Sequence, residues 1–324
     1  MKKILFGARD PAAANVLFPV IKKLEDIDFK VLASKESKQI FSDQKIDYVD
    51  VDSGFDVDRL FDEFNPDLVV TGPSVGKTVE REIVILAKKK GIKSVSILDF
   101  WMNYWQRYSD LDSGEKFVYL PDYIFVMDDM AKQDMVKEGF PGDKLIVTGN
   151  PYFDTFENFD FEGDYVLYVS QPRPDLSDDQ VKFFPNYNVI NDLIEVLDEK
   201  LIVRLHPKDN IKDFKQFNNE NVTVDIDTDI FELVKNANLV VGINSTVLFQ
   251  AALSGKLVIS YQNGLEEDKF IGKRLGICYS AYDKTSFQDL VRKALDGKLE
   301  QKSVDSKLDK GSTERVLKHI YSLI

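Results

Sequence analysis

Short runs of apolar, often β-branched residues alternate along the chain with segments in which apolar positions recur every three or four residues. The first pattern is typical of buried strands and the second of amphipathic helices. Strands are predicted at Ile4–Ala8, Phe29–Ala33, Tyr48–Val51, Asp67–Thr71, Ser94–Leu98, Tyr123–Met127, Lys144–Thr148, Tyr165–Ser170, Leu201–Leu205, Val222–Ile226, Leu239–Ile243 and Leu257–Tyr261. Because alternation of strands with helices favours a parallel sheet covered on both faces, the chain is predicted to be an α/β protein.

The helical segments fall between these strands and after the last of them. They are predicted at Ala12–Glu25, Lys77–Lys90, Met130–Glu138, Val189–Asp198, Lys212–Phe217, Ile230–Asn236, Thr246–Ser254, Ser286–Leu295 and Thr313–Leu323. The alternation lapses around Gly149–Gly163, so we predict two domains, residues 1–160 and 161–324, and the last helix could pack back on the first. The simplest architecture is two doubly wound, Rossmann-like domains that face each other across a cleft. Ligands of such sheets bind beyond the carboxyl ends of the strands, so the loops that follow strands are the places to look.

Composition narrows the range of partners. The chain has 324 residues, 42 of them basic and 55 acidic, and its net charge of -13 argues against nucleic acid or anionic lipid as a partner. A single cysteine, Cys278, and two histidines, His206 and His319, exclude an internal disulfide and a thiolate- or histidine-rich metal site. No apolar stretch reaches the roughly 20 residues that cross a bilayer, and charged residues follow Met1–Gly7. We therefore expect a cytoplasmic protein, with its oligomeric state open.

One candidate loop carries His206. This residue is the first after a predicted buried strand, Pro207 holds it in an extended turn, and Lys208 adds positive charge beside it. An imidazole in this position favours contact with a ligand in the cleft. The alternative is a histidine whose hydrogen bonds are satisfied inside the domain.

A second candidate loop leads into the helix predicted at residues 246–254. Asn244, Ser245 and Thr246 are good N-cap residues after an apolar strand, and the free N–H groups and hydroxyls of such a start suit a phosphate. Gln250, one turn into the helix, can reach a sugar hydroxyl, and Gly242 permits close approach of the backbone. Simple helix capping, which needs one of the three polar residues, is the alternative.

Together these loops resemble a known family. The sequence RLHP at residues 204–207, followed by NSTVLFQAALSGK at residues 244–256 and an apolar strand, is similar to the donor half of GT-B glycosyltransferases. The similarity is greatest to bacterial surface-polysaccharide enzymes of the sialyl-, polysialyl-, Kdo- and glycerophosphotransferase-like types. The similarity in sequence extends over residues 120–262, and the rest of the chain resembles these enzymes only in its predicted architecture.

The resemblance implies roles for individual residues. His206 and the pair Ser245 and Thr246 would bind the phosphate or ribose of the nucleotide, with Arg204 in the same motif as His206. Gln171 would lie near the donor's phosphates, although a linker turn explains that segment equally well. Many relatives carry Glu where this chain has Gln250, so the donor's identity does not follow from the motif.

In the first domain, Asp10 follows the first strand, in a loop that faces the cleft in GT-B enzymes. An inverting enzyme needs a base to deprotonate the acceptor hydroxyl, and Asp10 is the first candidate. The alternative is an N-cap at Asp10 with Pro11 in the first helical position. Arg9 could bind an acidic acceptor or the leaving phosphate.

Asp99 ends another predicted strand and is the second candidate base. Trp101 and Trp105, the two tryptophans of the chain, follow it, together with Asn103 and Arg107. Aromatic faces beside polar groups suit the apolar C–H face of a sugar, so Trp101, Asn103 and Arg107 are the acceptor-side candidates. A packed cap over the core of the first domain is the alternative.

One segment mimics a phosphate-binding P-loop. Residues 72–78, GPSVGKT, have three residues between the glycines where the P-loop has four, so the loop is too short to cradle a phosphate.

These observations, with the resemblance, predict a metal-independent glycosyltransferase that moves a sugar from a nucleotide-activated donor to a glycan or surface-polysaccharide acceptor. No cofactor and no metal are expected, because hydrogen bonds and a helix dipole can stabilise the departing phosphate. The alternatives are an enzyme like UDP-GlcNAc 2-epimerase, a non-catalytic nucleotide-sugar-binding protein and, least favoured, a P-loop NTPase.

Overall fold

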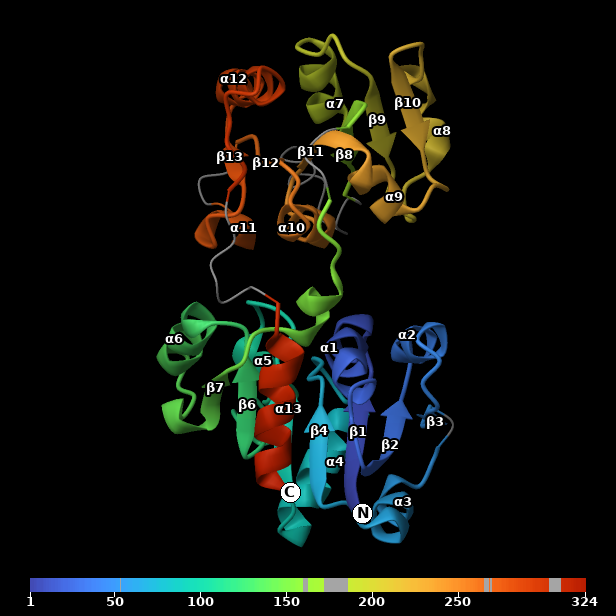
Figure 1. Ribbon diagram of the computed structural model, residues 1–324, viewed down its shortest axis with the longest axis vertical. Helices are drawn as coiled ribbons and strands as arrows, with labels where there is room; N and C mark the ends of the chain where they lie inside the picture. Colours follow the sequence, from blue (N-terminus) through green and yellow to red (C-terminus); the bar gives the residue numbers. More distant parts are fainter. Residues whose placement is uncertain (53, 160–162, 172–185, 265–267, 269, 303–309) are drawn as a thin grey trace. The chain divides into compact units, whose positions relative to one another are not determined.

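The computed structural model (Figure 1) describes residues 1–52, 54–159, 163–171, 186–264, 268, 270–302 and 310–324. The chain divides into two compact units. Unit 1 comprises Met1–Thr155 with Ser306–Ile324, and unit 2 comprises Phe156–Asp305. Each unit has its own parallel sheet and is therefore described by itself.

Over the described residues, unit 1 has a seven-stranded parallel sheet in the order β3-β2-β1-β4-β5-β6-β7. Its strands are β1 Lys2–Ala8, β2 Ile27–Ala33, β3 Val49–Asp50, β4 Leu68–Thr71, β5 Lys93–Ile97, β6 Tyr123–Val126 and β7 Leu145–Val147. Its helices are α1 Pro11–Ile21, α2 Ser37–Asp43, α3 Val57–Phe64, α4 Val79–Lys90, α5 Tyr104–Arg107, α6 Asp129–Lys137 and α13 Ser312–Leu323, with the 3-10 turns η1 Gly142–Lys144 and η2 Pro151–Thr155. The strand order reverses between β1 and β4, where doubly wound sheets bind ligands.

Helix α4 shows how the sequence sets these elements. The hydroxyl of Thr78 caps the helix by accepting a hydrogen bond from the N–H of Arg81. The helix ends at Gly91, whose φ of +69° is a left-handed conformation that glycine adopts without strain. Lys88–Lys90 lie in the last turn, where positive charge is favourable to the helix dipole.

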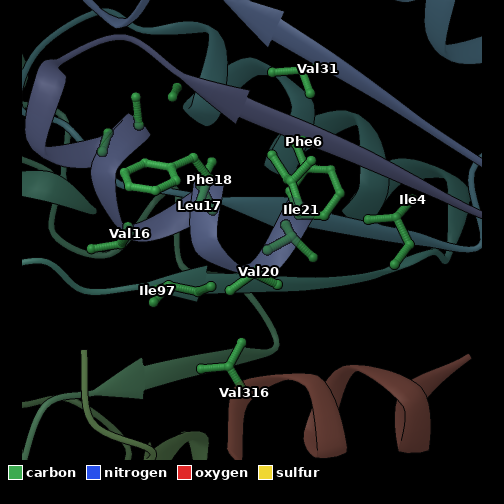
Figure 2. Packing of buried hydrophobic residues seen from close by; sticks show 14 of the residues in the cluster. Ile4, Phe6, Val16, Leu17, Phe18, Val20, Ile21, Val31, Ile97 and Val316 are labelled. Carbon is green, nitrogen blue, oxygen red and sulfur yellow. The ribbon is translucent and has the colours of Figure 1, made fainter. Parts of the chain in front are cut away.

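The largest core of unit 1 lies between the sheet and helices α1 and α13. Figure 2 shows side chains of β1, such as Ile4 and Phe6, packed with Val20 of α1 and Ile97 of β5. Val316 of α13 belongs to the same cluster, and it is fully buried. The C-terminal helix is therefore part of the core of unit 1, although unit 2 separates it from the rest of unit 1 in the sequence.

The carboxylate of Asp154 caps the start of α13. Asp154 of η2 accepts hydrogen bonds from the N–H groups of Gly311, Ser312 and Thr313, at 2.8, 3.1 and 2.6 Å. It also accepts one from the Thr313 hydroxyl at 2.6 Å. This single side chain satisfies backbone donors that a helix start leaves unpaired.

Over the described residues, unit 2 has a six-stranded parallel sheet in the order β10-β9-β8-β11-β12-β13. Its strands are β8 Tyr165–Val169, β9 Leu201–Arg204, β10 Val222–Asp225, β11 Ala237–Gly242, β12 Val258–Tyr261 and β13 Tyr279–Ala281. Its helices are α7 Asn186–Ile194, α8 Ile211–Phe214, α9 Ile230–Lys235, α10 Thr246–Leu253, α11 Ile271–Arg274 and α12 Lys284–Leu295, with the 3-10 turn η4 Lys215–Phe217. Here the order reverses between β8 and β11.

The predicted fold class is confirmed: both units are doubly wound α/β sheets, as the alternation of strands and helices indicates. Strand β13 has no counterpart among the predicted strands, because three residues that include a serine give no apolar run. The predicted domain boundary at residues 160–161 lies outside the described residues, and the two units divide at Thr155 and Phe156. None of the described helices is long and apolar enough to span a membrane.

Candidate functional site

Three loops lie at the carboxyl-end edge of the sheet of unit 2. They follow β8, β9 and β11, which are neighbours in the sheet, and they carry Gln171, His206 and Asn244. Because the strands are parallel, their carboxyl ends share one edge. The reversal between β8 and β11 makes this edge the expected ligand site of a doubly wound sheet. The loops that the sequence singles out on the donor side are thus neighbours in the structure.

The ring of His206 is oriented by its own loop. The N–H of Lys208 donates a hydrogen bond to Nδ1 of His206 at 3.1 Å, and the N–H of Asp209 donates to the His206 carbonyl at 2.8 Å. An Nδ1 that accepts a hydrogen bond carries no proton, so the proton of the neutral ring is on Nε2. Nε2 is therefore a donor, and it has no hydrogen-bond partner among the described residues.

A buried serine and an aspartate anchor this loop. The N–H of His206 donates to Oγ of Ser170 at 2.9 Å and to Oδ2 of Asp209 at 3.0 Å, and the Ser170 hydroxyl donates to the same carboxylate oxygen. Ser170, at the end of β8, is 2% exposed. Asp209 is not evident from the sequence, where it is one of 55 acidic residues. The sequence signal that could have found it is an acid three residues after a strand-end histidine.

Gln171 and Asn244 clamp the loops after β8 and β11 together. The N–H of Asn244 donates to Oε1 of Gln171 at 2.6 Å, and the side-chain amide of Gln171 donates to Oδ1 of Asn244. Asn186 of α7 holds the backbone of Gln171 by donating to its carbonyl at 2.9 Å. These two candidates therefore shape the edge of the site by binding each other, and Asn186 is a further positioning residue that the sequence does not reveal.

Helix α10 begins at the same edge. Ser245 is its N-cap, and its Oγ accepts a hydrogen bond from the N–H of Val247 at 3.2 Å. Thr246, the first helical residue, has an exposed side chain. A Cβ on Gly242 would lie 3.1 Å from the side chain of Leu248, so glycine keeps the strand close to its helix. The positive end of the helix dipole, together with an exposed hydroxyl, suits an anion.

The other donor-side candidates differ in what they contact. Arg204 pairs with Asp225 of β10 at 3.2 Å, and its side chain is 13% exposed, so it ties two strands together. Lys208 is exposed, and its ammonium group makes no ion pair with any residue that the structure describes. Gln250 is half-buried in α10. Lys208 is therefore the cation next to His206 that remains for an anionic ligand.

In unit 1, Asp10 stands at the N-cap position of α1 but makes no side-chain capping hydrogen bond. Its carboxylate lies 3.5 Å from NH1 of Arg9, and its side chain is 40% exposed. Arg9 also donates from NH1 to the carbonyl of Val75 at 3.2 Å. Pro11 takes the first helical position, as expected. Capping of α1 therefore does not occupy the carboxylate of Asp10.

Glu80 lies beside this loop, as the second residue of α4. Its Oε1 accepts hydrogen bonds from the N–H of Arg9 and the hydroxyl of Ser74, both at 2.8 Å. The residue is 2% exposed, and burial raises the pKa of its carboxyl. The sequence does not reveal Glu80, because an acid in the first turn of a helix is usually a surface residue that favours the helix dipole.

Asp99 and Arg107 form a buried ion pair. Oδ1 of Asp99 lies 2.5 Å from NH1 of Arg107, and the two side chains are 10% and 9% exposed. Arg107 also donates to the carbonyls of Pro73 and Met102, at 2.5 and 3.3 Å. The carboxylate of Asp99 is thus enclosed and held by Arg107, whereas that of Asp10 is 40% exposed. Asp10 is therefore the better placed of the two candidate bases.

The aromatic segment after β5 packs as a cap. The indole N–H of Trp101 donates to Oδ2 of Asp128 at 2.9 Å, and its ring stacks on Phe153 with centroids 6.1 Å apart. Trp101 is 6% exposed, which fits the packed cap rather than a sugar platform. Asn103 is exposed and adopts a left-handed φ of +56° just before α5.

The P-loop-like residues 72–78 connect β4 to α4, and their contacts are those of a loop packed against its neighbours. Lys77 pairs with Asp112 at 3.0 Å, and the carboxyl of Glu80 already occupies the first turn of the helix. A Cβ on Gly72 would lie 2.3 Å from the carbonyl oxygen of Ala13, so this glycine serves the packing of the loop against α1.

One family model and one curated relative match part of the chain. Residues 131–257 match the family model described as alpha-2,8-polysialyltransferase (POLYST), a span that includes His206, Ser245 and Thr246. An uncharacterized protein of Methanocaldococcus jannaschii is 24% identical over 208 residues, which make up 64% of this chain and 36% of that protein. The match thus spans well under half the length of this curated relative.

Solved structures share the fold over almost the whole chain. The UDP-GlcNAc 2-epimerase of Methanocaldococcus jannaschii is 18% identical with a TM-score of 0.72, and the match covers 99% of both chains. The UDP-GlcNAc 2-epimerase of Neisseria meningitidis bound to UDP-GlcNAc is 15% identical with a TM-score of 0.70, over 99% of this chain and 100% of that one. Anabaena HepE in complex with UDP-glucose is 14% identical with a TM-score of 0.59, over 99% of both chains. The chain therefore has the GT-B type of fold, with two Rossmann-like units.

Proposed function

We propose that unit 2 binds a nucleotide-activated sugar and that the protein transfers this sugar to a glycan acceptor without a metal ion. The observation that carries the proposal is the orientation of His206: its Nδ1 is occupied by the N–H of Lys208, and its Nε2 is left as a donor. The polysialyltransferase family model covers this residue. The solved structures bound to UDP-GlcNAc and UDP-glucose share the fold, which supports the same class of ligand.

In this proposal the carboxyl-end edge of the sheet of unit 2 stabilises the leaving group of the donor. When the bond between the anomeric carbon and the phosphate oxygen breaks, negative charge grows on that oxygen. The Nε2–H of His206, the ammonium of Lys208 and the start of α10 supply positive potential in a chain whose net charge is -13. Such fixed donors can stabilise the departing phosphate by themselves, so the proposal needs no metal ion.

The acceptor hydroxyl must lose a proton as it attacks. We assign this role to Asp10, because its carboxylate is partly exposed and makes no capping hydrogen bond, whereas Asp99 is held by Arg107. The guanidinium of Arg9 lies 3.5 Å from this carboxylate, close enough to contact the same ligand.

A second candidate function is epimerisation of a nucleotide sugar. It is favoured by the likeness of the whole chain to solved UDP-GlcNAc 2-epimerases. Epimerisation needs acid and base groups around the sugar and no acceptor, whereas glycosyl transfer consumes an acceptor. The two reactions therefore leave different products from the same donor.

The test is a thermal-shift screen of the protein with CMP, CDP, UDP, GDP and their sugars, followed by incubation with the stabilising donor alone and with candidate glycan acceptors. A nucleotide that binds the folded state raises the melting temperature by mass action. Transfer that depends on an acceptor supports the proposal, and a changed sugar without an acceptor establishes the epimerase instead. Binding without turnover would identify a non-catalytic binding protein, and no stabilisation by any nucleotide would overturn the proposal.

A further inference from the structure

Glu80 joins two loops at the point where the strand order of unit 1 reverses. Its Oε1 accepts hydrogen bonds from the N–H of Arg9, in the loop after β1, and from the hydroxyl of Ser74, in the loop after β4, both at 2.8 Å. Arg9 directly precedes Asp10, so the backbone that carries Asp10 is held by a side chain 71 positions away from Arg9 in the sequence. The contact therefore fixes the position of the proposed base.

The carboxyl group of Glu80 is buried. It is 2% exposed and forms no ion pair within the part of the chain that the structure describes. Burial raises the pKa of the Glu80 carboxyl, because an unpaired carboxylate is costly away from water. Since Oε1 accepts two hydrogen bonds, the proton of the neutral acid belongs on Oε2.

A small cavity lies next to this carboxyl. Glu80 and Tyr108 line it together with Thr71, Ser96 and Arg107, and the centre of a water molecule has about 10 Å³ of room there. Oε2 of Glu80 and the hydroxyl of Tyr108 are buried and have no hydrogen-bond partner among the described residues. A cavity of this size suits one water molecule, and buried polar groups are the partners that such a water needs.

We propose that Glu80 is a positioning residue of the proposed reaction, which fixes the loop of Arg9 and Asp10 through Oε1 and binds a buried water through Oε2. The proposal rests on the proposed function for the role of Asp10 in turnover. Its structural part, the hold of Glu80 on the loop, does not depend on that function and can be measured without a substrate.

Two conservative substitutions separate positioning from the chemistry of a carboxyl group. Glu80→Gln keeps the length of the side chain, an accepting Oε1 and a donor on the cavity side. Glu80→Asp keeps the carboxyl but is shorter by one methylene, so it cannot reach both the N–H of Arg9 and the hydroxyl of Ser74. The matched controls are Glu82→Gln and Glu82→Asp, because Glu82 lies in the same turn of α4 and is exposed.

The experiment is hydrogen–deuterium exchange of the segment around Arg9, together with kcat for transfer. We expect Glu80→Asp to speed exchange at Arg9 about five- to tenfold, as loss of one hydrogen bond does, and to lower kcat by about 10- to 100-fold through misplacement of Asp10. Glu80→Gln and both Glu82 variants are expected to stay within about twofold of the wild type in each measurement.

The reverse pattern, with activity kept in Glu80→Asp and lost in Glu80→Gln, would show that the carboxyl itself acts and would overturn the proposal. Unchanged exchange at Arg9 in Glu80→Asp would overturn it as well. If the wild type binds no nucleotide and transfers no sugar, the proposed function fails, while the exchange data still decide whether Glu80 holds the loop.

Discussion

The N–H of Lys208 donates a hydrogen bond to Nδ1 of His206 at 3.1 Å, two residues back along the same loop. This contact determines which nitrogen of the ring faces a ligand, because the proton of the neutral imidazole is then on Nε2. Pro207 lies between the two residues, in the turn that allows this contact. As a result, His206 presents a hydrogen-bond donor at the edge of the sheet where α10 also begins.

The anchor of this loop gives the first prediction. Asp209→Ala removes the carboxylate that accepts from the N–H of His206 and from the hydroxyl of Ser170. We expect a loss of about 1–3 kcal/mol in the free energy of unfolding, because two donors, one of them on the buried Ser170, lose a charged acceptor. Urea unfolding measures this loss, and Asp213→Ala, at an exposed position in α8, is the control. Equal stability of the two variants would contradict the anchoring role.

The assignment of the base gives a second prediction. Asp10→Asn is expected to lower kcat for transfer by about 100- to 10,000-fold while nucleotide affinity stays the same, since general-base catalysis contributes on that order. Asp99→Asn should instead reduce stability, because it leaves the guanidinium of Arg107 buried without its counter-charge. Assays of the wild type with and without EDTA also test the metal-free mechanism, which predicts equal activity in both. A wild type that loses its activity in EDTA would contradict it.

The C-terminal helix gives a third prediction. Asp154→Ala removes four hydrogen bonds from the start of α13, three of them to backbone N–H groups. We expect unit 1 to lose about 2–4 kcal/mol of stability, more than a single N-cap contributes, since one carboxylate satisfies several donors. Asp143→Ala, at an exposed position in η1, should change stability little. Denaturant unfolding measures the stability of the two variants, and amide hydrogen exchange measures how well α13 is protected in each. Equal exchange of α13 in both variants would rule out the capping role of Asp154.

The buried carboxyl of Glu80 predicts how the stability of the protein depends on pH. Burial raises the pKa of Glu80 in the folded state, so the unfolded chain releases this proton at a lower pH than the folded one. The stability that the neutral acid contributes is therefore complete below about pH 4 and is lost as the pH rises toward the folded-state pKa. Glu80→Gln cannot titrate, so its stability relative to the wild type should increase between about pH 4 and pH 7.

Urea unfolding at several pH values measures this difference. The carboxyl of Asp128 also has a pKa raised by burial, but it is present in both proteins and cancels when the two curves are subtracted. A difference that does not change with pH would mean that Glu80 has the same pKa in the folded and unfolded states.

The sequence predicts the fold well because alternation of strand and helix patterns is local information. The location of His206, Asn244 and Ser245 at one edge of the sheet follows from the same local information, because each comes after a predicted strand and parallel strands place their carboxyl ends at one edge. What holds these loops is not local. Ser170 and His206 are 36 positions apart, and Gln171 and Asn244 are 73 positions apart.

Contacts between distant segments also explain why some residues have another role, or another environment, than the sequence suggests. Arg204 lies in the motif with His206, but its partner Asp225 is on a neighbouring strand whose register the sequence does not specify. Trp101 is buried through contacts with Asp128 and Phe153, which come from later segments of unit 1. Glu80 has the sequence pattern of a surface acid, and only the packing of α4 against the loops after β1 and β4 buries it.

In the proposed function, His206 binds the phosphate of a nucleotide through Nε2. Its most direct test is calorimetric titration of the stabilising nucleotide into the wild type, His206→Ala and His319→Ala, where His319 is the other histidine of the chain and packs beside Phe125 in unit 1. We predict that His206→Ala weakens binding by about 10- to 100-fold, as loss of a hydrogen bond to a charged group does, and that His319→Ala leaves the dissociation constant unchanged. Equal affinity of the wild type and His206→Ala would contradict the claim.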